Sequence, residues 1–215
     1  MRLFTTLIAR DLRLAFGRGG AALPVVFFLL VATLYPFGVG PDGALLAKTG
    51  GGVLWIAALL ASLLPIDRLI APDAESGVLD QLAVRGVADE GVGAAKIIAH
   101  WLAFGPPLML AAIPAAGLLR LDGGILMRVE IGLLLGTPGL AALAVMIAAL
   151  TAGMRGAGAL GGLLLLPLAV PLLIFGAGSL DPAGASAFKL LAAVSLLLCA
   201  IGPFASGAAL RALRQ

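Results

Sequence analysis

The sequence predicts an all-α, polytopic membrane protein with about six transmembrane helices. Hydrophobic residues make up 61% of the 215 residues and charged residues only 12%, and the mean hydropathy is +1.14, which is outside the range of soluble domains. The apolar residues form uninterrupted runs long enough to cross a hydrocarbon core of about 30 Å. Because the alternation of polar and apolar residues typical of a membrane barrel is absent, we expect these runs to be helices.

Six apolar runs are the expected membrane spans. They cover residues 20–37, 50–66, 97–119, 129–150, 157–177 and 190–210. The second run is short, so it would cross untilted or thin the bilayer locally. Prolines inside the later runs free backbone carbonyls and are expected to kink their helices.

Residues 1–19 are expected to form an interfacial helix ahead of the first span. Most of the apolar positions recur at three- and four-residue steps among Arg2, Arg10, Arg13 and Arg18. One face of such a helix sinks into the headgroup boundary while its arginines face anionic lipid and water. A helix continuing straight into the first span would instead carry arginines into hydrocarbon.

The Lys and Arg residues predict that both termini are cytoplasmic. Ten of them fall on the side of the N-terminus and four on the other, an asymmetry that the positive-inside rule associates with the cytoplasm. The first group is Arg2, Arg10, Arg13, Arg18, Arg68, Arg85, Lys96, Arg155, Arg211 and Arg214; the second is Lys48, Arg120, Arg128 and Lys189. Since these residues flank spans, the pI near 9.6 reports topology and does not indicate nucleic-acid binding.

Residues 67–96 form an acid-rich cytoplasmic loop between the second and third spans. The loop holds six of the eleven acidic residues of the chain: Asp67, Asp73, Glu75, Asp80, Asp89 and Glu90. Pro72 and Asp73 are typical of a helix start, and Arg85 followed by Gly86 is typical of a helix end. We therefore expect a helix of about 11 residues, too short to span, whose Val78, Leu79 and Leu82 anchor a soluble partner.

The residues for catalysis or metal binding are missing. The chain contains no P-loop and no hydrolase or zinc-protease motif, and a single histidine does not build a His₂ or His₃ metal site. His100 and Trp101, at the start of the third span, are interpreted first as rings at the membrane boundary. The alternative is a contact with a substrate or with another subunit.

Several ordered motifs resemble one known family. LWIAALLASLLPIDRLIAPDAESGVLDQL, AKIIAHWL, LLLGTPGLAAL and PLLIFGAG are similar to segments of the CcmB family, the membrane subunits of the haem exporter used in cytochrome c maturation, and the similarity covers nearly the whole chain. The chain differs from the family pattern at Pro65, before IDRL, and at Pro72, before Asp73. These prolines are expected to shorten or redirect the docking helix.

The resemblance implies an ABC-2 type permease fold over residues 1–215 as a single domain, with two copies forming the pathway in a bacterial inner membrane. It implies a non-catalytic subunit: ATP and Mg²⁺ belong to a partner ATPase, CcmA, and this chain alone binds no cofactor. CcmC, CcmD and the haem chaperone CcmE are the other implied partners, and haem is the ligand transported or delivered. The implied coupling residues are Glu75, Ser76, Gly77, Val78, Leu79, Asp80, Gln81 and Leu82.

Two other functions fit the same architecture. One is an ABC-2 permease for a lipid, a polysaccharide or a drug, since nothing in the spans encodes haem. The other is a membrane scaffold that only holds partners together. A secondary transporter is disfavoured, because the expected spans contain almost no ionisable residue.

Overall fold

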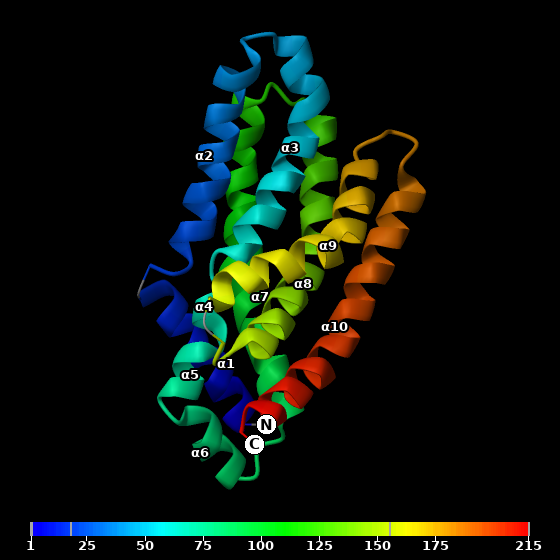
Figure 1. The fold of residues 1–215 in the computed structure, drawn as a ribbon. Helices are drawn as coiled ribbons and strands as arrows, with labels where there is room; N and C mark the ends of the chain where they lie inside the picture. The colour runs from blue at the N-terminus through cyan, green and yellow to red at the C-terminus, as the bar shows by residue number, and fades with distance from the viewer. Residues whose placement is uncertain (1, 18, 155, 215) are drawn as a thin grey trace.

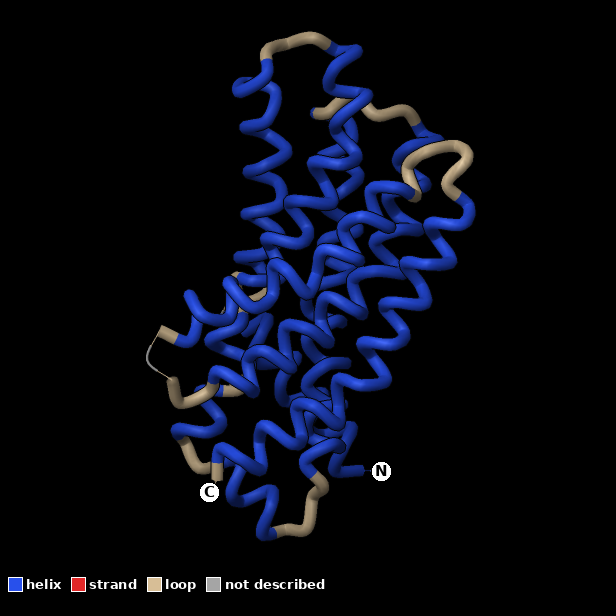
Figure 2. The backbone as a smooth tube through the Cα atoms, turned by 45° about the vertical axis from the view of Figure 1, so that its right-hand side comes forward, coloured by secondary structure: helices blue, strands red, loops and turns tan. Residues whose placement is uncertain are grey.

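The computed structural model describes residues 2–17, 19–154 and 156–214, and it contains helices and no strand within these ranges (Figures 1 and 2). Six helices are long and apolar enough to cross a membrane, which confirms the predicted number of spans. They are α2 (Ala22–Val39), α3 (Gly43–Leu63), α7 (Asp89–Leu118), α8 (Gly123–Thr151), α9 (Ala157–Gly178) and α10 (Ala185–Leu213).

Four spans, α3, α7, α8 and α10, begin five or more residues earlier than the hydropathy of the sequence predicts. Helix α3 begins at Gly43 rather than at residue 50, because the Asp42 carboxylate caps it by accepting hydrogen bonds from the backbone amides of Ala44 and Leu45. Helix α7 begins at Asp89 rather than at residue 97. The second span is therefore long enough to cross the bilayer without thinning it.

Four further helices gather at the end of the bundle that carries both chain termini, called the terminal end below (Figure 1). They are α1 (Arg2–Gly17), α4 (Ile66–Leu69), α5 (Ala71–Glu75) and α6 (Val78–Val84). The connections α2–α3, α7–α8 and α9–α10 lie at the opposite, far end. A helix thus covers the segment predicted to be interfacial, and its position at a membrane surface stays a prediction.

The basic residues separate onto the two ends as the sequence predicts. Arg120, Arg128 and Lys189 lie on or beside the far-end connections, whereas Arg10 and Arg68 belong to α1 and α4 of the terminal end and Arg214 follows the last residue of α10 there. Arg18 and Arg155 lie outside the described residues. Because the two ends differ in basic charge, the structure agrees with the asymmetry on which the predicted topology depends.

Helix α8 forms the centre of the bundle and packs against α3, α7, α9 and α10. Its Gly132 and Gly136 face the indole of Trp55, and a Cβ atom on Gly136 would lie 2.6 Å from Cη2 of that ring. Close packing of this kind replaces hydrophobic driving force inside a membrane. The outward faces of α2, α9 and α10 remain exposed and apolar, as lipid contact requires.

The prolines predicted to kink the spans lie inside continuous helices. Helix α7 continues through Pro106, Pro107 and Pro114, and α9 continues through Pro167 and Pro171. These residues therefore end none of the spans that contain them.

Candidate functional site

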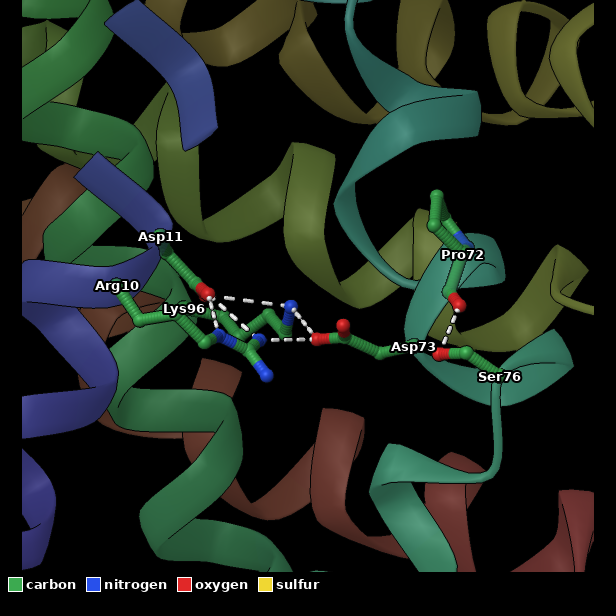
Figure 3. Close-up of polar contacts among 6 residues, drawn as sticks. All are labelled: Arg10, Asp11, Pro72, Asp73, Ser76 and Lys96. Carbon is green, nitrogen blue, oxygen red and sulfur yellow. Dashed lines mark hydrogen bonds and ion pairs between the residues drawn. The ribbon is translucent and has the colours of Figure 1, made fainter. Parts of the chain in front are cut away.

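The acid-rich segment folds as short helices and not as the single helix of about 11 residues that its sequence predicts. Helix α5 ends at Glu75 and α6 begins at Val78. Between them Gly77 has φ +71°, a left-handed conformation that L side chains rarely adopt. The Ser76 hydroxyl closes α5 by donating to the Pro72 carbonyl at 2.6 Å (Figure 3). Gly77, which the sequence analysis places inside the expected helix, is the point where the chain changes direction.

The two prolines that depart from the family pattern, Pro65 and Pro72, lie at different positions relative to the helices. Pro65 lies between α3 and α4, at the end of the second span. Pro72 is the second residue of α5, where its missing N–H has no helical partner to lose. Pro72 is therefore compatible with the helix start, and the break in the predicted helix occurs at Gly77 instead.

Leu79 and Leu82, which the sequence analysis expects to anchor a partner, do not face outward in this chain. Their side chains are only 3% and 8% exposed because they pack into the core of this chain. Val84 is 89% exposed, and it lies about 140° around the helix from Leu79 at 100° per residue. Five of the exposed residues of the segment, Glu75, Ser76, Asp80, Gln81 and Val84, are called the coupling surface below.

Asp73 is the centre of a buried ion-pair cluster that fixes the segment to the bundle (Figure 3). One oxygen of its carboxylate, Oδ2, accepts hydrogen bonds from both Arg10 of α1 and Lys96 of α7. Asp11 completes the cluster, with its Oδ1 accepting from Arg10 Nε at 2.8 Å and its Oδ2 lying 3.2 Å from Lys96 Nζ. Two carboxylates and two cations thus join α1, α5 and α7.

The cluster sets the charge state of Asp73. Burial by itself would raise the pKa of the Asp73 carboxyl, but the charges and hydrogen bonds of Lys96 and Arg10 outweigh burial and lower this pKa below its ordinary value. The side chain of Lys96 is only 8% exposed, so its ammonium depends on these carboxylates for compensation.

A second set of ion pairs holds the C-terminal end of α10 against the same region. Arg214 pairs with Asp89 in the first turn of α7 and also reaches the Leu79 carbonyl of α6 at 3.5 Å. Arg211 pairs with Glu90. The negative charges of Asp89 and Glu90 also suit a helix N-terminus. The segment is thus tied to α1 and α7 on one side and to α10 on the other.

His100 is buried within the protein, whereas Trp101 is half-buried. His100 is 6% exposed, its ring stacks on that of Phe104 with centroids 5.7 Å apart, and its buried Nε2 has no hydrogen-bond partner. The Trp101 indole N–H donates to the Thr137 hydroxyl of α8 at 3.1 Å. Trp101 therefore connects two spans, and His100 retains a polar atom with unused bonding capacity.

The charged side chains of this region connect helices that are far apart in the sequence. Within the described part of the chain, no three His, Cys, Asp or Glu side chains form a group that could hold a metal ion. Several acidic and basic side chains at the terminal end, among them Asp73, Lys96 and Arg214, are paired with one another across helices. A partner that pushes on the coupling surface would therefore act on α1, α7 and α10 together.

Comparison with known proteins agrees with the motif resemblance. A family model described as CcmB protein matches residues 2–213. Heme exporter protein B of Rhodobacter capsulatus is 47% identical over 211 residues, which cover 95% of this chain and 97% of that protein. The protein of the same name from Paracoccus denitrificans is 48% identical, with coverage of 95% and 97%. That of Escherichia coli K12 is 38% identical, with coverage of 97% and 98%.

Proposed function

Since the chain belongs to the CcmB family, we propose that it is the membrane permease subunit of a haem exporter that serves cytochrome c maturation. On this proposal the chain is non-catalytic, and a separate ATPase, CcmA, binds and hydrolyses ATP with Mg²⁺. Haem is the ligand transported or delivered. The names of the relatives support the haem assignment, and the six apolar helices support a multi-pass membrane subunit.

The proposed complex contains two copies of this chain together with CcmA, CcmC, CcmD and the haem chaperone CcmE, in a bacterial inner membrane. We place the terminal end in the cytoplasm. The excess of basic residues at that end supports this orientation. A cytoplasmic terminal end also presents the coupling surface to a soluble ATPase.

The observation that carries the proposal is the position of the coupling surface. It projects from the terminal end, while Asp73 and the Leu79 carbonyl on the same segment are bonded to α1, α7 and α10. Because Leu79 and Leu82 are buried beneath the surface, α6 moves with the bundle. Closure of an ATPase dimer against this face would be transmitted to the spans.

Charge reversal on the coupling surface tests this proposal. Glu75→Arg combined with Asp80→Arg changes two exposed acids whose side chains form no ion pair in the described part of the chain. We expect at least a tenfold loss of copurifying ATPase, because the double change reverses the charge of the proposed interface and destroys its electrostatic complementarity to the partner. The yield of c-type cytochromes should fall in parallel. Lys189→Glu, an exposed charge reversal at the far end, is the matched control and should change neither.

Unchanged assembly and unchanged cytochrome yield in the double variant would refute the coupling assignment. A milder variant, Val84→Ser, distinguishes a permease from a scaffold. A scaffold has no function beyond assembly, so every variant that assembles normally should also support normal cytochrome maturation. A Val84→Ser complex that assembles but hydrolyses ATP without producing c-type cytochromes favours the permease.

A further inference from the structure

A cavity of about 380 Å³ lies at the terminal end among α1, the start of α2, the short helices α4 and α5, and α7. The charged part of the lining consists of the ion-pair cluster shown in Figure 3 and of Arg68 of α4. Much of the remaining lining is apolar and includes Leu14, Pro24 and Phe104. The cavity therefore suits a molecule with an anionic group attached to hydrocarbon.

The charges that line the cavity do not cancel. Arg10 and Lys96 are paired with Asp11 and Asp73, which leaves the guanidinium of Arg68 in excess. The neighbouring Asp67 does not neutralise it: its carboxylate faces Gly158 of α9, and no ion pair joins it to Arg68 among the described residues. The lining thus carries one net positive charge, which matches one phosphodiester.

His100 supplies a second unused polar group. It lines the same cavity, is 6% exposed, and its Nε2 atom has no partner in the described protein. A buried polar atom without a hydrogen bond is destabilising, so a ligand that reached Nε2 from the cavity would stabilise it. A phosphate oxygen has the acceptor capacity to do so when Nε2 carries the ring proton.

The depth of the cavity points to lipid. Helix α7 has 30 residues, a length of about 45 Å, which exceeds a hydrocarbon core of about 30 Å. With the far end of α7 at one boundary, roughly its first ten residues project beyond the core, and His100 lies near the headgroup level. Amphipathic α1 closes the cavity on the side where an interfacial helix meets headgroups.

We propose that this cavity binds the headgroup of an anionic phospholipid, with the phosphate held by Arg68 and His100 and the adjoining glycerol and acyl carbons against Leu14 and Pro24. Such a lipid would be part of the wall between α1 and α7. The site concerns the membrane and not the cargo, so it does not depend on the proposed function. A zwitterionic lipid fits less well, because its own cation competes with Arg68.

The test uses the full-length chain, purified in neutral detergent and titrated with phosphatidylglycerol, phosphatidylcholine or inorganic phosphate while native mass spectrometry counts bound molecules. We expect one phosphatidylglycerol per chain, bound more tightly than phosphatidylcholine. Arg68→Gln should weaken this binding about tenfold, since it removes a charge-assisted hydrogen bond. Arg13→Gln removes an equal charge from the exposed side of α1, outside the cavity, and should change it less than twofold.

His100 provides an independent variant. His100→Leu should weaken phosphatidylglycerol binding, and His100→Gln, which keeps an N–H donor, should restore part of it. Equal binding by wild type and Arg68→Gln, or an equal loss in Arg13→Gln, would overturn the site. Displacement of phosphatidylglycerol by an equal concentration of inorganic phosphate would overturn the lipid assignment in favour of a free anion.

Discussion

Asp73 connects more helices of the terminal end than its sequence context predicts. In the sequence Asp73 is typical of a helix start. Lys96 is there only one of the basic residues whose distribution predicts the membrane topology. In the structure the two side chains meet, although 23 positions separate them, and Arg10 joins them from 63 positions away. Sequence spacing predicts side-chain contacts only within about one helical turn, and neither partner lies that close to Asp73. The pairing could therefore be seen only in the folded structure.

Asp73→Asn tests the energetic role of this carboxylate. The substitution leaves Lys96 buried with only Asp11 as a partner, so near pH 7 we expect a loss of about 2 kcal/mol in the free energy of unfolding, measured in detergent. The loss depends on pH. Because the pKa of folded Asp73 lies below the ordinary value of 3.8, its stabilisation is complete above that value and disappears as pH falls through the lower, folded pKa.

The difference between wild type and Asp73→Asn should therefore shrink as the thermal unfolding midpoints are compared from about pH 7 down to about pH 3. Asp80→Asn is the control, since it removes an exposed carboxylate from the same segment. A difference that stays constant with pH would mean that Asp73 stabilises the protein by packing and not by charge.

At the scale of the helices, a single residue, Gly77, determines the geometry of the break between α5 and α6. Gly77 is in the left-handed region, yet a Cβ atom there would meet nothing within 4 Å. Any effect of a side chain at this position is therefore conformational and not steric. The break allows Leu79 and Leu82 to face the core while Val84 faces outward.

Gly77→Ala should cost about 1 kcal/mol, the penalty of a left-handed L residue, and should reorient α6 rather than unfold the bundle. We expect reduced coupling, measured as a smaller stimulation of ATPase activity in the assembled complex, with little change in the melting of the spans. Gly91→Ala is the matched control: Gly91 lies in the first turn of α7 with no positive φ, and its added Cβ also meets nothing. Alanine is favoured there, so the control should be neutral or slightly stabilising. Equal effects of both substitutions would exclude a role for the left-handed turn.

At the scale of the whole molecule, the two chain ends converge on the segment between the second and third spans (Figure 1). Helix α1 reaches it through Arg10, and the end of α10 reaches it through Arg214. Short helices of this size are marginal alone and depend on such tertiary contacts. The terminal end is therefore a unit assembled from sequence positions at both extremes of the chain.

Arg214→Gln should loosen this unit without disturbing the spans. It removes the ion pair with Asp89 and weakens the contact with the Leu79 carbonyl, so amide hydrogen exchange in residues 78–84 should accelerate several-fold. Exchange in α8 should be unchanged. Arg85→Gln provides the comparison, because Arg85 is exposed and makes no ion pair in the described ranges. Equal exchange in α6 of wild type and Arg214→Gln would show that Leu79 and Leu82 alone hold the helix.

The sequence by itself determined the class of the protein, the number of its spans, the asymmetry of its basic charge and its family. These follow from hydropathy, charge counts and ordered motifs, which do not depend on how helices pack. Only the tertiary structure decided which residues of the 67–96 segment face outward. Leu79 and Leu82 have the spacing of partner anchors, but the bundle covers them, and the same packing leaves Val84 exposed. Burial of one helix face is settled by what other segments bring to it, and here those segments come from residues far away in the chain.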